Sequence, residues 1–386
     1  MIIAVDSFAL SSRFANTGTY NYASNVLKGC LRIAESLESG VEFHAFVGGG
    51  DNWAADGLAS SHLRVHPSRL VSRNQLWRFG GMALSTSLLR PDLIFLPTGQ
   101  ASIPYPASPI VGTVLDAMYM RLPPEYLGTK YKVRSHLLSW ALTKLASRII
   151  TISHWSKKDL VDVYCLDPRR VEVIYLGYDK QLYNDTPPDP AASAALLSRL
   201  GVRKPFVLHH GLLELRKNVH RLIQAFDRVC SASKEFAGQL VLAGSMGYGY
   251  EEILKVRGAS RNREQIILTG HLPDVELATL VKNASLCVIP SLYEGFCLPM
   301  VEAMACGIPT VASNGSCIPE VSRDVLEYFD PHSVEEIAEV IQRALEDSNL
   351  RDGLRDRGLA RAAEFSWERC ARETLAVFAR VVARHG

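Results

Sequence analysis

Two glutamates eight residues apart are the first side chains whose types and spacing suggest chemistry. Glu294 lies in a loop after the apolar run Leu286–Ile289, and we expect Glu302 in the first turn of a helix that starts near Pro299. A carboxylate there can accept two hydrogen bonds from a ribose diol when the phosphates of a nucleotide approach the helix N-terminus. Two simpler explanations stay open: Glu302 can stabilise the helix dipole, and Glu294 can be an ordinary loop acid.

The backbone between these glutamates suits the same kind of ligand. Gly295 allows a close approach of the main chain, and the amides of Phe296, Cys297 and Leu298 can hold phosphate or sugar oxygens at the start of the helix. A catalytic role for Cys297 would need a base nearby in the sequence, and none is evident. We therefore interpret this loop as a binding site rather than as a nucleophile site.

The run HHGLLELRKNVHRLIQAF, residues 209–226, is the second candidate. Its Arg216 and Lys217 follow a strand-like segment and precede an amphipathic helix. Two cations and free amides at a helix start suit a diphosphate, whose charge they stabilise as it departs. An exposed basic helix start is the simpler alternative. We expect His209 and His210 to be packed at the strand end rather than to act as an acid or a base.

Apolar runs and helical periodicity alternate along the chain, which is the pattern of α/β folds with parallel sheets. Prolines and small residues interrupt this pattern at residues 184–205, where we place a domain boundary. The sequence therefore predicts two doubly wound Rossmann-like domains, residues 1–190 and 203–366, whose strand ends face a cleft. The predicted strands are Ile2–Val5, Glu42–Val47, Leu93–Leu96, Ile110–Val114, Ile149–Ile152, Val171–Ile174, Phe206–His209, Gln239–Ala243, Gln265–Leu268, Leu286–Ile289 and Thr310–Ala312. The predicted helices include Tyr20–Ser36, His136–Ala146, Lys157–Val163, Val334–Leu345 and Ser366–Ala383.

Composition excludes several classes of protein. The start MIIAVDSFAL lacks the basic residues and cleavage site of a signal peptide, and no apolar run approaches the length of a spanning helix. The eight cysteines are scattered without a CxxC pair, so we expect reduced thiols and a cytoplasmic protein. No D-x-D pair is present, so no metal site is predicted. Nucleic acid is not an expected partner, because no arginine-rich tail or aromatic RNA-binding signature occurs.

Positive charge gathers in the first half of the chain. Residues 1–150 carry 14 Lys and Arg against 9 Asp and Glu, and the windows 57–91 and 126–158 hold no acid. Both windows also carry Leu and Trp at helical spacing, so a basic amphipathic surface can contact anionic lipid or an anionic substrate. A solvated helix face with a buried apolar side is the alternative.

The run from Ser291 to Ser313, SLYEGFCLPMVEAMACGIPTVAS, closely resembles the signature of the family 4 retaining glycosyltransferases, group 1 glycosyl transferases with the two-domain glycosyltransferase-B fold. The resemblance implies that Glu302 binds the donor ribose and that Glu294 contacts a hydroxyl of the transferred sugar. It also implies that the amides of residues 296–298 lie near the sugar and diphosphate. Cys297 departs from the glycine that is usual in the family, which narrows the room beside the donor.

The second candidate resembles the family's G-x-L-x-P-R-K-N run, which implies that Lys217 and Arg216 contact the diphosphate. Many members have an arginine directly after the glycine, whereas Leu212 follows Gly211 here. The closing segment FSWERCARETLAVFARVV resembles the family's C-terminal helix, about residues 367–386, which packs back against the first domain.

Weaker matches cover the rest of the chain. NREQIILTGHLPDVELATLVKNASLCVIPS resembles the family segment whose backbone, here around His271 and Leu272, meets the base. ANTGTYNYASNVL resembles the glycine loop after the first strand, so Gly18 would face the donor phosphate or the acceptor. IVGTVLDAMYMRLPPEY resembles a T-x-H-D segment in which Leu115 replaces the histidine and Asp116 remains.

The resemblance implies a retaining hexosyltransferase that acts by front-face displacement without a metal or other cofactor. The donor would be GDP-mannose or a UDP-sugar, and the acceptor a glycan or lipid-linked glycan in polysaccharide biosynthesis. Glu294, Lys217, Arg216 and Asp116 are the catalytic candidates, and the basic first half favours a lipid-linked or anionic acceptor at the inner membrane face. A nucleotide-sugar epimerase of the same fold and a non-catalytic nucleotide-sugar-binding protein remain alternatives. A dehydrogenase is excluded, because no G-x-G-x-x-G follows the first strand.

Overall fold

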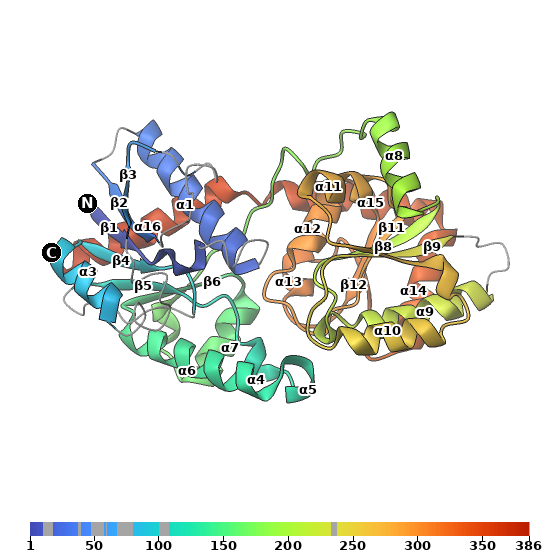
Figure 1. Ribbon diagram of the computed structural model, residues 1–386, viewed down its shortest axis with the longest axis horizontal. Helices are drawn as coiled ribbons and strands as arrows, with labels where there is room; N and C mark the ends of the chain where they lie inside the picture. Colours follow the sequence, from blue (N-terminus) through green and yellow to red (C-terminus); the bar gives the residue numbers. More distant parts are fainter. Residues whose placement is uncertain are drawn as a thin grey trace. The chain divides into compact units, whose positions relative to one another are not determined.

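The computed structural model describes residues 1–10, 18–37, 40–47, 58, 60–67, 80–99, 108–232 and 238–385. These residues form two compact units, each a parallel sheet with helices packed on it (Figure 1). Unit 1 comprises Met1–Arg121, Lys130–Gly177 and Ser366–Gly386, and unit 2 comprises Leu122–Thr129 and Tyr178–Phe365. The predicted α/β class with two doubly wound domains is confirmed.

The sheet of unit 1 has seven strands in the order β3-β2-β1-β4-β5-β6-β7. Its pairings are parallel, and β4 and β5 are buried along their whole length. Continuous burial is typical of parallel strands covered on both faces. The strands are β1 (Ile2–Val5), β2 (Glu42–Val47), β3 (Leu63–Pro67), β4 (Leu93–Leu96), β5 (Ile110–Thr113), β6 (Arg148–Thr151) and β7 (Val171–Val173).

The C-terminal helix α16 (Trp367–His385) belongs to the core of unit 1, as predicted. It packs against α1 (Gly18–Ser36), where a Cβ on Gly29 would lie only 2.6 Å from the Cβ of Ala371. Glycine at this crossing therefore lets the two helices approach closely. The other helices of unit 1 are η1 (Ser7–Leu10), α3 (Met82–Leu89), α4 (Met118–Arg121), α6 (Thr129–Leu145), α7 (His154–Tyr164) and η4 (Pro168–Arg170).

The sheet of unit 2 has six strands in the order β10-β9-β8-β11-β12-β13, and their pairings are parallel. Its strands are β8 (Phe206–His210), β9 (Gln239–Ala243), β10 (Ile266–Gly270), β11 (Leu286–Ile289), β12 (Thr310–Ser313) and β13 (Glu327–Phe329). Its helices are α5 (Pro124–Leu127), α8 (Pro190–Leu200), η5 (Leu215–Lys217), α9 (Val219–Ala232), α10 (Tyr250–Ala259), η6 (Arg263–Gln265), α11 (Asp274–Lys282), α12 (Leu298–Ala305), α13 (Ile318–Ser322), α14 (Val334–Glu346) and α15 (Ser348–Ala363). One apolar cluster joins α9 and α14 to the sheet through buried residues such as Phe226, Val288 and Ile341.

Several elements differ from the predicted pattern. The edge strands β3 and β13 carry polar residues, and β13 has only three residues, so neither is an apolar run. The prolines of residues 184–205 do not exclude a helix there, because Pro190 starts α8 and the Asp189 carboxylate caps it by accepting from the amide of Ala192 at 2.7 Å. The polar helix α15 buries few side chains, which hides its periodicity.

Helix α6 starts at Thr129 rather than at the predicted His136; Leu142 is buried, but other apolar side chains lie on its exposed face. The buried side includes Ser135, Ser139 and Thr143, whereas Val133, Leu137 and Trp140 are 54%, 56% and 48% exposed. The alternative of a polar solvated face with a buried apolar side is therefore wrong for this helix. In the other basic window, Arg69, Arg73 and Arg78 lie outside the described residues.

Candidate active site

The two candidate segments meet at the point where the strand order of unit 2 reverses. Strand β8 lies between β9 and β11, so the chain leaves β8 toward one side of the sheet and β11 toward the other. Open α/β sheets bind ligands at the carboxyl ends of strands at such a reversal. Lys217 follows β8 and Glu294 follows β11, which explains why residues 77 positions apart come into contact.

Lys217 and Glu294 form a buried ion pair with a distance of 2.5 Å between Nζ and Oε1. Arg216 donates from Nη1 to Glu294 Oε2 at 3.3 Å and to the Tyr293 carbonyl at 3.2 Å. Ser291 donates from Oγ to Glu294 Oε1 at 2.7 Å. The structure therefore brings the three predicted residues Glu294, Lys217 and Arg216 together.

The charge of Glu294 is strongly stabilised. Burial by itself raises the pKa of this carboxyl, but Lys217, Arg216 and the hydroxyl of Ser291 outweigh burial and hold the pKa at about 2. A carboxylate with that pKa accepts hydrogen bonds and does not donate a proton near neutral pH. Glu294 is thus suited to orient a hydroxyl group, and the adjacent cations are suited to an anionic ligand.

Asn218 fixes the loop that carries the two cations. Its backbone is left-handed with φ of 61°, and its fully buried side-chain amide donates to the carbonyls of Pro290 and Pro331 at 3.0 and 2.6 Å. The amide of Leu292 donates to the carbonyl of Arg216 at 2.9 Å. These bonds tie the loop after β8 to the loop after β11.

Glycines make room for the loop after β8. Gly211 and Gly244 have φ of 123° and 150°, and a Cβ on Gly244 would lie 1.8 Å from the carbonyl oxygen of Gly211. The loop then runs beside the one after β9, since the amides of Leu213 and Leu215 donate to the carbonyls of residues 245 and 248. Only glycine permits this approach at Gly244.

Glu302 lies in the second turn of α12, which corrects the prediction of a place in the first turn, because the helix begins at Leu298. Burial, with Asp274 and Asp179 nearby, raises the pKa of Glu302 to about 8. His210 Nδ1 lies 3.8 Å from its carboxylate, but burial lowers the pKa of His210 to about 3, so this contact is not an ion pair at neutral pH. Glu302 is therefore a largely buried carboxyl whose contact to His210 is not an ion pair at neutral pH, and a pair of hydroxyl donors would suit it.

Cys297 occupies the cap position of α12 with φ of 70°, a left-handed conformation that favours glycine. A glycine would adopt this conformation with less strain than Cys297 does. Burial raises the pKa of the thiol, so Cys297 is a poor nucleophile. Its neighbours Gly295, Phe296 and Leu298 lead into the helix, and the ring of Phe296 is buried.

The remaining predicted residues are spread over both units. In unit 2, His271 is exposed and Leu272 is buried, directly after Gly270 with φ of 71°. In unit 1, Gly18 begins α1, and the carboxylate of Asp116 accepts from the amide of Met118 at 3.0 Å.

Sequence reasoning missed several residues of the site, among them Glu214, which pairs with Arg216 at 2.5 Å. Ser291 bonds the Glu294 carboxylate, Ser316 accepts from the amide of Glu294 at 3.0 Å, and Asp179 contributes charge beside Glu302. Ser291 opens the matched run, so its position was a usable signal. The sequence positions of Ser316 and Asp179 give no such signal, because only folding brings these residues near the glutamates.

The residues that the structure describes show neither a metal cluster nor a membrane-spanning helix. No group of three or more His, Cys, Asp or Glu is placed to hold a metal ion there. No helix within the same part of the chain is long and apolar enough to cross a membrane.

Comparison with known proteins places both units. Residues 198–361 match the family described as glycosyl transferases group 1, and residues 30–182 match glycosyltransferase family 4. O-antigen chain mannosyltransferase B of Escherichia coli is 31% identical over 60% of this chain and 60% of its own length. MMP alpha-(1->4)-mannosyltransferase of Mycolicibacterium hassiacum is 31% identical over 61% of this chain and 54% of its own length. The matched region thus spans little more than half of these relatives.

Solved structures share the fold over the full chain. Sucrose-phosphate synthase from Thermosynechococcus elongatus has a TM-score of 0.75 at 19% identity and is covered completely, as is this chain. HepE from Anabaena, in complex with UDP, has a TM-score of 0.71 at 20% identity, with 98% of this chain and 99% of that chain covered. The chain belongs to the group 1, family 4 glycosyltransferases with the glycosyltransferase-B fold.

Proposed function

We propose that this protein transfers a hexose from a nucleotide diphosphate sugar to a glycan or lipid-linked glycan, with retention of anomeric configuration and without a metal. The observation that carries the proposal is the buried cluster of Lys217, Arg216 and Glu294 at the strand reversal of unit 2. Two cations there suit a departing diphosphate, and an ionised carboxylate beside them suits a sugar hydroxyl. The mannosyltransferases among the relatives support a mannose-type donor, GDP-mannose first.

The roles of the residues follow from their charges. Lys217 and Arg216 share the Glu294 carboxylate in the absence of ligand, so a diphosphate would compete for their hydrogen bonds and gain charge-assisted contacts. Glu294 stays ionised and orients the sugar, while Glu302 accepts the ribose hydroxyls. No acid–base pair is needed in front-face displacement, because the departing phosphate accepts the proton of the acceptor, and the enzyme positions the reactants.

The first test is nucleotide binding followed by transfer. We expect GDP or UDP to raise the melting temperature of the wild-type protein and to have a weaker effect on Glu302→Ala; a ligand at 100 times its dissociation constant adds about 2.7 kcal/mol of stability. Transfer is then measured with GDP-mannose and UDP-glucose, in the presence of EDTA, and the anomer of the product is read by NMR. Stabilisation by none of GDP, UDP, ADP and CMP would overturn the donor site.

The same assays separate the alternatives. An epimerase would convert the sugar of the donor without an acceptor, and a binding protein would be stabilised by the nucleotide yet transfer nothing to any acceptor. An inverted product anomer would refute retention but leave the transferase assignment standing. Loss of transfer in EDTA that added Mg²⁺ restores would refute the metal-independent mechanism.

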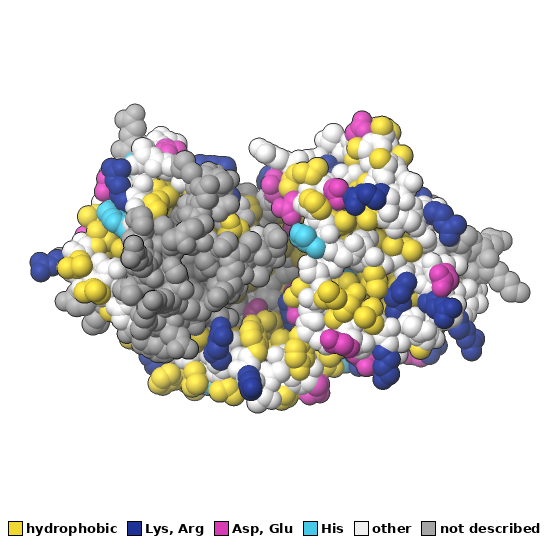
Figure 2. All heavy atoms as spheres, viewed as in Figure 1, with side chains coloured by type: hydrophobic (Ala, Val, Ile, Leu, Met, Phe, Trp, Pro, Cys, Tyr) yellow, Lys and Arg dark blue, Asp and Glu magenta, His cyan; other side chains and the backbone are white. Residues whose placement is uncertain are grey.

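We also propose that unit 1 contacts anionic membrane through the exposed face of α6, where a lipid-linked acceptor would be met. Val133, Leu137 and Trp140 are about half exposed there, and Lys130 and Arg134 are exposed beside them. Figure 2 shows hydrophobic side chains with basic ones among them along the lower left edge, where α6 lies in Figure 1. Apolar side chains flanked by cations suit an interface of anionic lipid. A second copy of this face would be repelled, since residues 126–158 hold no acid.

A further inference from the structure

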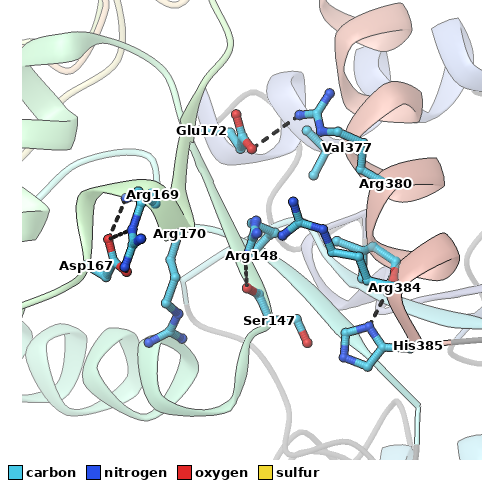
Figure 3. A pocket seen from close by; sticks show the side chains of 11 residues that line it. Ser147, Arg148, Asp167, Arg169, Arg170, Glu172, Val377, Arg380, Arg384 and His385 are labelled. Carbon is cyan, nitrogen blue, oxygen red and sulfur yellow. Dashed lines mark hydrogen bonds and ion pairs between the residues drawn. The ribbon is translucent and has the colours of Figure 1, made fainter.

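A cavity of about 390 Å³ in unit 1 is lined by more positive charge than its carboxylates balance (Figure 3). Five arginines line it, against the two carboxylates of Asp167 and Glu172. Its volume lies within the roughly 300 to 1,000 Å³ of small-molecule sites. The surplus of three positive charges points to an anionic ligand.

The cavity lies at the opposite end of the sheet from the predicted catalytic residue of unit 1. Arg148 is the first residue of β6, and Glu172 lies at the start of β7, so both mark the amino ends of parallel strands. Asp116 follows β5 at the carboxyl end, where such folds bind their substrates. The cavity is therefore a site separate from that edge.

Two of the five arginines already have carboxylate partners. Arg169 pairs with Asp167 at 2.8 Å, and Arg380 pairs with Glu172 at 3.2 Å. A third, Arg170, points toward the end of α6, where its Nη2 donates to the carbonyls of Thr143 at 2.8 Å and Ala146 at 2.6 Å.

Arg148 and Arg384 are left for a ligand. In Figure 3 their side chains extend from β6 and α16 toward the middle of the cavity. Within the part of the chain that the structure describes, the one side-chain hydrogen bond recorded for Arg148 is to the carbonyl of Ser147 at 3.0 Å, and neither arginine has an ion pair. Two guanidinium groups that line one cavity, neither of them paired with a carboxylate, repel each other. A bound anion would offset that repulsion.

The charge balance indicates the kind of anion. The C-terminal ends of α6 and α16 each carry about half a negative charge, which offsets about one of the three surplus positive charges. About two positive charges remain, and a phosphomonoester carries about −1.5 to −2 at pH 7. Arginine is also the side chain best suited to phosphate, because its planar group donates two parallel hydrogen bonds.

We infer that this cavity binds a phosphomonoester through Arg148 and Arg384. The group can belong to a soluble metabolite, such as a sugar phosphate, or to the headgroup of phosphatidic acid in a membrane. The shared chemistry is the dianionic phosphate, and the two sources are separated by experiment.

The test compares Arg148→Gln/Arg384→Gln with Lys255→Gln/Arg263→Gln, which removes the same charge from exposed positions of unit 2. Both double variants are made in a Lys217→Met protein, which leaves Arg216 without Lys217 in the donor site and so weakens binding of the probe there. Inorganic phosphate is titrated by calorimetry at constant ionic strength. Co-sedimentation uses phosphatidylcholine vesicles that contain phosphatidic acid or, at matched charge, phosphatidylglycerol.

We expect the cavity variant to bind phosphate at least about tenfold more weakly than the control, because two charge-assisted contacts are lost. If the cavity variant also binds phosphatidic acid vesicles more weakly than the control does, and the two bind phosphatidylglycerol vesicles equally, the site binds a lipid. If the two variants differ only in their binding of free phosphate, the site binds a soluble ligand. Equal behaviour of the two variants toward both probes, or no binding by the parent protein, overturns the proposal. Arg384→Gln alone, at an exposed position in the last turn of α16, repeats the comparison if the double variant does not fold.

Discussion

Lys217 has 9% of its side chain exposed, and its Nζ lies 2.5 Å from the Glu294 carboxylate. Removing one partner of a buried ion pair leaves the other charge uncompensated, which is costly even where the intact pair contributes little. Arg216 contacts the same carboxylate at 3.3 Å and also pairs with Glu214 at 2.5 Å, so two carboxylates match the two cations of the site. A donor diphosphate would compete with these carboxylates for the two cations.

Lys217→Met should lower kcat for transfer by about 10²- to 10³-fold, since one donor to the leaving group disappears. Glu294 would keep Arg216 as its partner, so we expect the protein to fold. Steady-state kinetics with the preferred donor measure the effect, and Lys255→Met on the exposed face of α10 is the matched control. A kcat within threefold of the wild-type value would remove Lys217 from the catalytic group.

Glu302 makes stability and nucleotide binding depend on pH. Its pKa is raised from 4.5 to about 8, so the unfolded chain releases this proton first as the pH rises. The free energy of unfolding should therefore fall between about pH 4.5 and pH 8, by at most about 1.4 kcal/mol per pH unit, relative to Glu302→Gln. Urea unfolding of both proteins from pH 5 to 9 measures this difference.

The affinity for nucleotide should rise with pH over the range in which the free energy of unfolding falls. A ribose diol donates hydrogen bonds, which the ionised form of Glu302 accepts better, so affinity for the nucleoside diphosphate should rise toward pH 8 in the wild type. Glu302→Gln should lack this rise. Parallel pH profiles of affinity for the two proteins would contradict the ribose role, and parallel stability profiles would contradict the raised pKa.

At the scale of elements, the site depends on loops that are held rigidly to the sheet. Asn218 joins the loop after β8 to the chain after β11 and after β13, through the carbonyls of Pro290 and Pro331. Gly211 and Gly244 let the loops after β8 and β9 touch. These contacts place the cations before any ligand arrives.

Asn218→Ala should lower the free energy of unfolding by about 2 to 4 kcal/mol, because two buried carbonyls lose their donor and a left-handed backbone acquires a poorly suited residue. Asn218→Gly loses the same hydrogen bonds but tolerates φ of 61°, so it should be about 1 kcal/mol less destabilised. Denaturant unfolding separates the two effects. Equal stability of the two variants would show that backbone strain contributes nothing.

Gly244→Ala should destabilise the protein by about 3 kcal/mol or more, because its Cβ would overlap the Gly211 carbonyl and its φ is unfavourable for alanine. Gly258→Ala is the matched control: it lies in α10 with open space around its Cβ and should stabilise by about 0.5 to 1 kcal/mol. Thermal unfolding of both variants tests the sign. A Gly244→Ala protein as stable as the wild type would contradict the close approach.

At the scale of the whole molecule, the two units carry different candidate binding features. Unit 2 contains the cluster of Lys217 and Glu294, whereas unit 1 exposes the apolar stripe of α6 and the arginine cavity. Helix α16, at the end of the chain, completes the core of unit 1. Deleting residues after 365 should therefore expose the face of α1 that α16 covers.

Leu137→Gln/Trp140→Gln should reduce binding to vesicles that contain phosphatidylglycerol by at least about tenfold, since two large side chains lose their burial in the interface. The control is Leu254→Gln/Val275→Gln, which replaces exposed apolar side chains of unit 2. Co-sedimentation at low and high salt measures both. Binding that is indifferent to this substitution, to anionic lipid and to salt would refute the membrane contact.

The sequence by itself determined the fold class and most strands. It also predicted Glu294, Lys217 and Arg216 as members of a candidate site, and the structure brings these three residues together. Buried parallel strands are continuous apolar runs, and loop residues at their carboxyl ends are readable as local strings such as residues 209–226 and 291–313. The edge strands β3 and β13 and the polar helix α15 were not predicted, because they bury too little apolar surface to leave a pattern.

Only the tertiary structure decided which residues of these segments contact one another and which other residues they contact. Three features depend on contacts between residues far apart in the chain: the pairing of Lys217 with Glu294, the contribution of Asp179 to the raised pKa of Glu302, and the exposure of apolar side chains on α6. A helix that buries serines and exposes Trp140 has no distinct periodicity of its own. Burial and electrostatic energies depend on which residues are close in space. The linear sequence does not list those contacts, because they form only when the chain folds.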